Sequence, residues 1–227
     1  MKELKITKGM KIKLLGDSIT HGVGGSGFEQ NGAHIVGEYS RSPESFCWAN
    51  LFRDYMAREY SAEVINNGCS GTKIEFIIEN FDTLVEDDDD LIICTIGTNN
   101  RHQYKETGER RTREDFGEEF YKKVLRLNEM LVGRGKRVIF ISNIPASQEN
   151  EKDKVDFWRI LHMDDINEIY KRASAAAGFE HISMYDLITE YVSKNALTID
   201  ALLCDGLHPN DEGYRVMFEL LKNALGV

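Results

Sequence analysis

Short apolar runs alternate along the chain with longer segments in which apolar residues recur at helical spacing. Two of the runs are almost continuously apolar, as expected of strands that are covered on both faces. Together with three less apolar runs they give five predicted strands, at residues 12–15, 63–66, 91–96, 137–142 and 181–184. Alternation of strands with helical segments is typical of βα units around a parallel sheet.

The helical segments between the runs have recognisable start signals. Thr112, with Asp115 three residues later, predicts the start of a helix that ends near Gly133 and Gly135. Its buried face is predicted to be Phe116, Phe120, Val124, Leu127 and Leu131. A second long helix is predicted from Ile160, Leu161, Ile169, Tyr170 and Ala173. The last helix is expected to begin near Asn210, a good N-cap, and to bury Tyr214, Met217, Phe218 and Leu221.

A length of 227 residues suits a single α/β domain, so residues 1–227 are expected to form one unit. Two segments near 21–46 and 101–111 are irregular or highly charged and are predicted to be loop insertions. A third polar segment, 147–153, connects predicted elements. Insertions of this kind often form the walls or lid of a site.

Composition narrows the classes of function. Apolar residues make up 41% and charged residues 29% of the chain, as in an ordinary core-forming protein, and the net charge is −10. That charge argues against a nucleic-acid partner, which requires a basic face. No stretch approaches the ~20 apolar residues of a membrane span, and no signal peptide is recognised, so a cytoplasmic location is expected. The four cysteines show no CxxC spacing and are expected to be free thiols.

The strongest chemical signal joins two distant segments. The first predicted strand leads into Gly16-Asp17-Ser18-Ile19-Thr20, which delivers Ser18 to the carboxyl edge of the sheet. A serine hydroxyl needs a base to become a nucleophile, and Asp205-Gly206-Leu207-His208-Pro209 supplies one near the other end of the chain. Of the six histidines, only His208 follows an aspartate at this spacing within a loop shaped by glycine and proline. Ser18, His208 and Asp205 are therefore predicted to act as nucleophile, base and orienting acid.

A serine acyl transfer also needs donors for the negative charge of the tetrahedral intermediate. Gly68, in the loop after the second strand, could offer a backbone N–H, and Asn99, after the third strand, a side-chain amide. Each segment has the alternative interpretation of a simple tight turn, because glycine and asparagine favour positive φ.

The whole set resembles the SGNH/GDSL hydrolase family, whose four sequence blocks supply Ser, Gly, Asn and His in this order. The matching segments begin with Gly16-Asp17-Ser18, continue with Gly68 and Gly97-Thr98-Asn99-Asn100, and end at Asp205 to His208. The resemblance implies a flavodoxin-like three-layer α/β/α sandwich with a parallel sheet of about five strands. It also implies an oxyanion hole made of the Ser18 N–H, the Gly68 N–H and the Asn99 amide. Asn100 departs from the pattern, since the family commonly has aspartate there.

Other motifs in the chain have simpler explanations. Gly22 to Gly27 fits GxGxxG but lacks the strand and helix of a dinucleotide site, so a flexible loop is favoured. The acidic run 86–90 is interpreted as a solvated turn, and Gly133 to Lys136 as a helix stop. Asp17 is expected to brace its loop. No metal or organic cofactor is expected.

Two further groups of residues could contact a substrate. The basic residues at 101, 105, 110, 111 and 113 could meet an anionic substrate, although a solvated loop is favoured. Tyr39 and Trp48 could stack on a sugar, but Trp48 is better placed as a core residue at the start of a helix over 47–60.

The predicted function is a serine ester hydrolase that works through an acyl-enzyme. The polar insertions favour a short acyl group, such as acetyl, on a small-molecule or carbohydrate substrate. Two alternatives remain open at the sequence level. One is an O-acyltransferase with the same triad, which would give more transfer than hydrolysis when an acceptor is supplied. The other is a non-catalytic carbohydrate-binding protein on this fold, which would bind ligand without turnover. Oligomeric state is not indicated.

Overall fold

The computed structural model describes residues 6–29 and 45–227. Part of the predicted insertion at 21–46, including Tyr39, therefore lies outside the described residues. Within the described residues, no helix has the length and apolarity needed to cross a bilayer.

Five parallel strands form the central sheet, in the order β2-β1-β3-β5-β7. The strands are β1 (Lys11–Gly16), β2 (Glu63–Gly68), β3 (Leu91–Thr95), β5 (Arg137–Ser142) and β7 (Glu180–Ser183). All five predicted strands are confirmed. Counted within the sheet, the order is 2-1-3-4-5, which is the flavodoxin-like arrangement.

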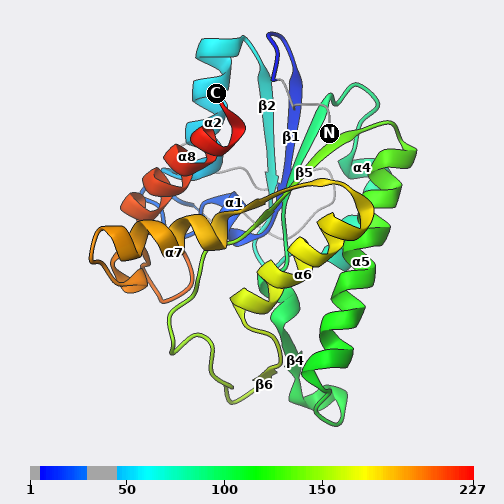
Figure 1. Cartoon of the computed structure of the whole chain (residues 1–227), viewed down its shortest axis with the longest axis vertical. Helices are drawn as coiled ribbons and strands as arrows, with labels where there is room; N and C mark the ends of the chain where they lie inside the picture. Colours follow the sequence, from blue (N-terminus) through cyan, green and yellow to red (C-terminus); the bar gives the residue numbers. More distant parts are fainter. Residues whose placement is uncertain (1–5, 30–44) are drawn as a thin grey trace.

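The sheet is covered by helices on both faces, which gives the expected three-layer α/β/α sandwich (Figure 1). One layer holds α2 (Trp48–Tyr60), α7 (Met184–Lys194) and α8 (Asp211–Leu225). The other holds α3 (Ile74–Glu79), α4 (Phe81–Leu84), α5 (Arg113–Gly133) and α6 (Met163–Ala177). Strand β3 shows why two layers are needed. Leu91 and Ile93 belong to one core and Ile92 and Cys94 to the other, because successive side chains of a strand point to opposite faces.

The predicted start signals of α5 and α8 are confirmed. Thr112 caps α5 by accepting the Asp115 N–H at 3.1 Å, and Asn210 caps α8 by accepting the Gly213 N–H at 3.0 Å. The prediction for the middle helix was wrong at its start. Ile160 and Leu161 precede α6, because both donate their N–H groups to the Arg101 carbonyl oxygen at 2.9 Å and are held outside the helix. Helix α7 was not predicted.

The charged segment 101–111 is not an irregular loop. It contains β4 (His102–Tyr104) and a short 3-10 turn, η2 (Lys105–Thr107). Strand β4 pairs antiparallel with β6 (Phe157–Arg159) to form a two-stranded ribbon. The ribbon continues below the carboxyl ends of the sheet strands in Figure 1, on the side where one-turn helix α1 (Ser18–His21) follows β1.

Candidate active site

Ser18 is placed by the end of β1. The strand stops at Gly16, Asp17 caps the next turn, and Ser18 is the first residue of α1. The Asp17 carboxylate accepts the Ile19 N–H at 3.0 Å, which fixes the strand-to-helix turn. As the first residue of a helix, Ser18 has a backbone N–H with no intrahelical acceptor. Only 6% of Ser18 is exposed, so its hydroxyl lies in a sheltered position at the carboxyl edge of the sheet.

Three side chains predicted to act together do meet in space. His208 Nε2 lies 2.9 Å from Ser18 Oγ, although the two residues are 190 positions apart in sequence. On the other side of the ring, His208 Nδ1 lies 2.7 Å from Asp205 Oδ2. This is the serine–imidazole–carboxylate geometry in which a base can accept the hydroxyl proton while the acid fixes the ring.

The loop that carries Asp205 and His208 is fixed by its own backbone. Leu203 bridges to Pro209, and the Cys204 N–H donates to the His208 carbonyl oxygen at 2.9 Å. Asp205 Oδ1 accepts the N–H groups of Leu207 and His208 at 3.0 and 2.8 Å. Partial burial of Asp205 works against ionisation, but these N–H groups and the imidazole together lower the pKa of its carboxyl group. The carboxylate is therefore charged at neutral pH and ready to orient a histidine.

Asp17 has the bracing role expected from sequence. It is fully buried, and its Oδ2 accepts the Asn143 Nδ2–H at 3.2 Å. Burial raises the pKa of Asp17, while hydrogen bonds from Thr98 and the Ile19 N–H oppose the rise. Asn143 also donates to Thr98 Oγ1 at 2.6 Å, so the ends of β1, β3 and β5 are tied together beneath Ser18.

The predicted oxyanion donors are in different situations. Asn99 lies in the 3-10 turn η1 (Thr98–Arg101), and its Nδ2 donates to the Thr72 carbonyl oxygen at 3.0 Å, which leaves a second amide hydrogen. The Gly68 N–H, in contrast, donates to Asn66 Oδ1 at 2.8 Å. The same asparagine donates to the Thr20 carbonyl oxygen at 2.9 Å, which holds the end of β2 against α1.

Gly68 therefore has a packing role that the sequence did not indicate. A Cβ there would lie 2.5 Å from the His21 backbone nitrogen, so only glycine allows this approach. Gly71, three residues later, is exposed with φ of 80°, and its N–H has no acceptor among the described residues. The Ser70 and Gly71 N–H groups of this loop have no acceptor among the described residues, whereas the Gly68 N–H is engaged by Asn66.

The departure at Asn100 has a local cause. Its Oδ1 accepts the Ile74 N–H at 3.0 Å, and its Nδ2 donates to Glu75 Oε2 at 2.7 Å. An aspartate would have no hydrogen to donate to Glu75 and would place two carboxylates in contact. The amide thus suits the neighbour that this chain has.

The sequence predicted a polar connector at residues 147–153 but did not indicate that this part of the chain, together with the residues just before it, connects the parts of the site. Residues 143–151, here called the bracing segment, follow β5. They contact three loops at the carboxyl edge of the sheet, which carry Asp17, Arg101 and Gly206. Asn143 bonds Asp17, the Ser147 N–H donates to the Gly206 carbonyl oxygen at 2.8 Å, and Glu151 pairs with Arg101 at 2.7 Å. Asn143 directly follows a predicted strand, and that position could have marked it as a site residue. Nothing in the sequence indicated that Arg101 would be buried.

The basic residues after Asn99 are paired within the protein and do not form a free anion site. Arg101 is completely buried, so the solvated-loop interpretation was wrong for this residue. It binds Asn150 and the Thr98 carbonyl oxygen in addition to Glu151. The others contact the Lys154 carbonyl oxygen (Lys105), Asp153 (Arg110), Glu119 (Arg111) and Asp165 (Arg113).

Two other interpretations are settled by position. Trp48 is 2% exposed and begins α2, as expected of a core residue. The glycine run from 22 to 27 follows α1 instead of joining a strand to a helix, so it lacks the dinucleotide-binding arrangement. Gly24 packs on the loop of the histidine, where an added Cβ would lie 2.5 Å from the Pro209 carbonyl oxygen.

The acidic run before β3 forms ion pairs with two lysines of β1. Glu86, Asp88 and Asp89 come close enough to resemble a cation site, but Lys11 and Lys13 already contact them. Asp89 is 4% exposed, so the interpretation as a fully solvated turn was wrong for this residue.

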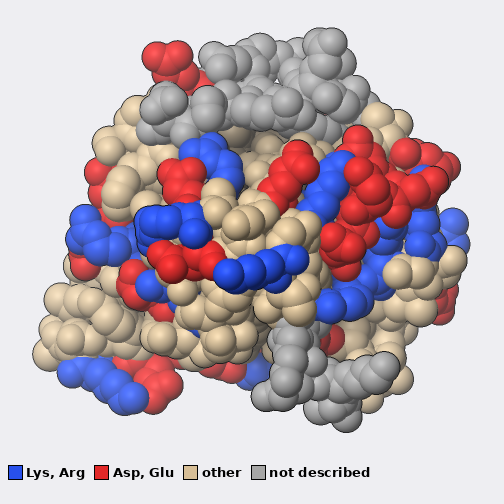
Figure 2. Space-filling view, turned by 90° about the horizontal axis from the view of Figure 1, so that it is seen from above, with Lys and Arg blue, Asp and Glu red and all other residues tan. Residues whose placement is uncertain are grey.

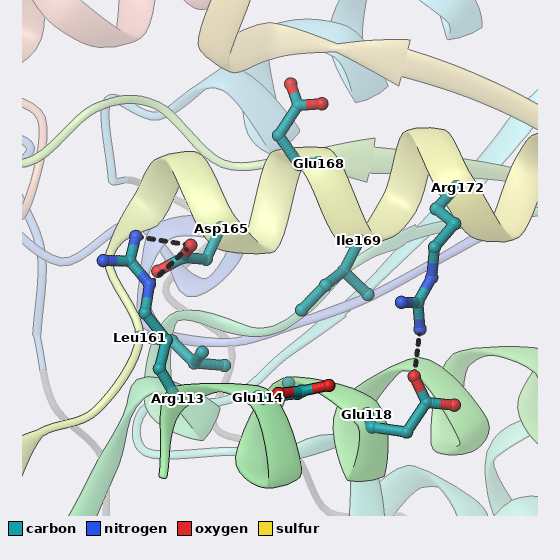
Figure 3. A pocket seen from close by; sticks show the side chains of 9 residues that line it. Arg113, Glu114, Glu118, Leu161, Asp165, Glu168, Ile169 and Arg172 are labelled. Atoms are coloured by element: carbon teal, nitrogen blue, oxygen red, sulfur yellow. Dashed lines mark hydrogen bonds and ion pairs between the residues drawn. The ribbon is translucent and has the colours of Figure 1, made fainter.

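A groove of about 500 Å³ between α5 and α6 contains none of the triad residues. Its floor is apolar, with Leu161 and Ile169, and an ion pair stands at each end (Figure 3). Arg113 pairs with Asp165, and Arg172 pairs with Glu118 at 2.6 Å. Both arginines are thus already neutralised, and the groove is separate from the serine site.

Comparison with known proteins places this arrangement in a family. No curated protein matches the chain in sequence. Among solved structures, the acetylxylan esterase Axe2 from Geobacillus stearothermophilus aligns with a TM-score of 0.71 at 18% identity, covering 99% of this chain and 97% of that one. LAE5, an α/β hydrolase enzyme from the metagenome of Lake Arreo, Spain, aligns with a TM-score of 0.72 at 19% identity, covering 97% of each chain.

These alignments show the SGNH hydrolase fold, which was the expected one. Residues 14–216 match the GDSL-like lipase/acylhydrolase family, a range that includes the segments of Ser18, Asn99 and His208. The chain belongs to this family of SGNH hydrolases and is a carboxylic ester hydrolase.

Proposed function

We propose that Ser18, His208 and Asp205 hydrolyse a short-chain ester, and in particular an acetyl ester carried on a carbohydrate. The observation that carries the catalytic part is the continuous contact from Asp205 through His208 to Ser18. In the first half of the reaction, Ser18 Oγ attacks the ester carbonyl carbon and its proton passes to His208 Nε2. The imidazolium, stabilised by Asp205, then gives this proton to the departing alcohol.

The second half regenerates the enzyme. Water attacks the acyl-enzyme, His208 accepts its proton, and the carboxylic acid leaves as Ser18 Oγ recovers the proton. Both halves pass through an oxyanion. We propose the Ser18 N–H, the second hydrogen of the Asn99 amide and the Gly71 N–H as its donors. The Gly68 N–H was expected in this role but is engaged by Asn66.

The proposed substrate class rests on two kinds of support. The segments 21–46 and 101–111 are polar in sequence, which suits a small or sugar-borne ester better than a long acyl chain. A structurally similar protein is an acetylxylan esterase. Catalytic mutants of that esterase replace a serine, and an aspartate and histidine three residues apart, the spacing of Asp205 and His208 here.

The test is hydrolysis of p-nitrophenyl esters from acetyl to long chain, together with acetylated xylo-oligosaccharides. We expect the highest kcat/KM with acetyl and a fall with chain length. Ser18→Ala should lower kcat by at least ~10³-fold, as removal of a nucleophile does. Ser174→Ala is the matched control, since Ser174 lies on α6 and its Oγ donates to the Phe179 carbonyl oxygen at 2.6 Å.

Three outcomes would contradict parts of this proposal. Equal activity of Ser18→Ala would exclude Ser18 as the nucleophile. Preference for long-chain esters would exclude the short-acyl substrate. Transfer of acetyl to added methyl xyloside in excess of hydrolysis would assign the same residues to an acyltransferase.

A further inference from the structure

One face of the β4–β6 ribbon carries an aromatic cluster that is in neither hydrophobic core. Tyr104 lies opposite Phe157, and His102 opposite Arg159, so these four side chains share a face. The His102 ring centroid lies 5.1 Å from that of Tyr104 and 4.7 Å from that of Phe157. Tyr104 is 43% exposed and is the one aromatic side chain among the large hydrophobic residues that the described part of the chain exposes to solvent. Core packing therefore does not account for the cluster.

This face lies between two loops of the candidate active site. On one side, Lys73 Nζ lies 5.6 Å from the Tyr104 ring centroid. Lys73 directly follows Thr72, whose carbonyl oxygen binds the Asn99 amide. The aromatic face thus contacts the residue that directly follows Thr72, which holds the proposed oxyanion donor Asn99.

On the other side, the face is tied to the bracing segment. Arg159 Nε donates to the Asn150 carbonyl oxygen at 3.2 Å, and the Arg159 guanidinium carbon lies 5.0 Å from the Phe157 ring centroid. Three residues earlier, Ser147 bonds Gly206 in the loop of Asp205 and His208. The cluster therefore borders both the oxyanion side and the histidine side of the site.

The chemistry of the face suits an uncharged ring with hydroxyl groups. Exposed aromatic rings bind flat apolar surfaces, which the C–H faces of a pyranose provide. The Lys73 ammonium has no carboxylate partner among the described residues, so its three hydrogens remain for hydroxyl acceptors. Burial, with Lys73 and Arg159 nearby, lowers the pKa of His102 to about 4. Neutral imidazole can both donate and accept a hydrogen bond.

We propose that the face formed by His102, Tyr104 and Phe157 binds the pyranose ring whose ester Ser18 cleaves, with Lys73 donating to the ring hydroxyls. This inference rests on the proposed function, because it names the alcohol side of the same substrate. The platform holds the sugar against the ribbon while the acyl group reaches Ser18 and Asn99.

The test compares two acetyl esters that differ only in whether the alcohol is a sugar. Parent protein and Tyr104→Ala are assayed with acetylated xylobiose and with ethyl acetate. We expect Tyr104→Ala to raise KM for the sugar ester about 3- to 10-fold, the range of one aromatic stacking contact, with kcat nearly unchanged. Ethyl acetate kinetics should change less than twofold, and Tyr104→Phe should restore the parent KM.

Tyr121→Ala is the matched control. Tyr121 also carries a cation over its ring, at 3.6 Å from Arg172, but lies on α5 away from the ribbon. It should leave both substrates unaffected. Equal losses on both esters for Tyr104→Ala, or none on either, would overturn the platform. Parent hydrolysis of ethyl acetate without preference for the sugar ester would also overturn it, while leaving the ester hydrolase intact. A parent inactive on both esters would instead overturn the proposed function.

Discussion

The two ends of the central sheet each hold a buried cation, and they use it differently. At the amino end, Lys13 on β1 contacts Glu86 and Asp89 at 2.6 and 3.4 Å, and its side chain is 4% exposed. At the carboxyl end, the fully buried Arg101 contacts Glu151 and Asn150 at 2.7 and 3.1 Å. Both residues satisfy the rule that a buried charge needs partners. They differ in what their partners are attached to.

At the amino end the partners belong to one short turn. Glu86, Asp88 and Asp89 come from the same four residues of chain, and Lys136 donates to the Asp87 and Asp89 carbonyl oxygens. Figure 2, which looks onto the molecule from above in Figure 1, shows basic and acidic side chains interleaved on this face instead of gathered by sign. The charges here neutralise each other, and the cluster fixes the turn before β3.

At the carboxyl end the side-chain partners of Arg101 belong to one segment, but that segment also contacts other loops of the site. Arg101 lies two residues after Asn99, and its side-chain acceptors Asn150 and Glu151 lie in the bracing segment, which also bonds Asp17 and Gly206. The network therefore joins the loops of the nucleophile, the oxyanion donor and the histidine. The ion pairs of Lys13 at the amino end stabilise the fold. Those of Arg101 at the carboxyl end stabilise the fold and also hold the catalytic loops in position.

The largest effect should come from the oxyanion side of the carboxyl end. Asn99→Ala removes a donor to the tetrahedral intermediate, and we expect kcat to fall about 10²- to 10³-fold with little change in KM. Asn99 also holds the Thr72 carbonyl oxygen, so circular dichroism and thermal unfolding should show that the variant remains folded. A change confined to KM would assign Asn99 to ground-state binding.

The next largest effect is expected from replacing the two buried cations, Arg101 and Lys13. Arg101→Met leaves Glu151 without its partner and should reduce the free energy of unfolding by about 3–5 kcal/mol. Displacement of the bracing segment should also lower kcat of the folded variant about 10- to 100-fold. Lys13→Met should lose comparable stability, because Asp89 is buried, yet keep kcat within twofold of the parent. Stability is measured by denaturant unfolding and kcat at a temperature where both variants are folded.

The comparison between the two ends would fail in either of two ways. Lys13→Met could lower kcat as much as Arg101→Met, or Arg101→Met could lower stability alone. Arg101→Lys adds a further check, because an ammonium cannot reach both Asn150 and Glu151 with the geometry of a guanidinium. It should recover part of the stability and less of the rate.

The smallest effect is a pH dependence at the amino end. Lys13 and Lys11 lower the pKa of Glu86 from 4.5 to about 2. A depressed carboxyl pKa contributes stability above the unfolded value and loses it as pH falls through the folded one. Glu86→Gln should therefore cost less than about 1 kcal/mol near neutral pH, since Glu86 is half exposed, and the difference from the parent should shrink between about pH 4.5 and 2. Activity at neutral pH should not change. An equal difference at all pH values would assign the effect to packing.

Sequence patterns sufficed for the parts of the fold that repeat a period. The five strands follow from continuous or alternating apolar runs, and α5 and α8 from caps at Thr112 and Asn210. Helix α6 was misplaced because the apolar Ile160 and Leu161 bind the Arg101 carbonyl oxygen instead of entering the helix. The β4–β6 ribbon was missed because its strands are three residues long and are separated by 52 residues of chain, which leaves no local pattern.

The candidate site was predictable to the extent that its residues stand in short motifs at strand ends or in the loop before the last helix. Ser18, Asn99, Asp205 and His208 stand in short motifs whose residue types reveal their chemistry. Gly68 alone was predicted as the backbone donor of its loop, because the bond from the Gly68 N–H to Asn66 cannot be seen in the sequence. Arg101 and the bracing segment act through tertiary contacts between residues about 50 positions apart, and such contacts leave no signature in a single sequence.

The central claim is that Ser18 is the nucleophile activated by His208. The most direct measurement is to inactivate the protein with a phosphonofluoridate ester and to locate the covalent adduct by peptide mass spectrometry. The account predicts one adduct, on the peptide that contains Ser18, formed in parallel with loss of esterase activity. His208→Ala should form it far more slowly. An adduct on another residue with full loss of activity, or an active protein that is not labelled at Ser18, would contradict the account.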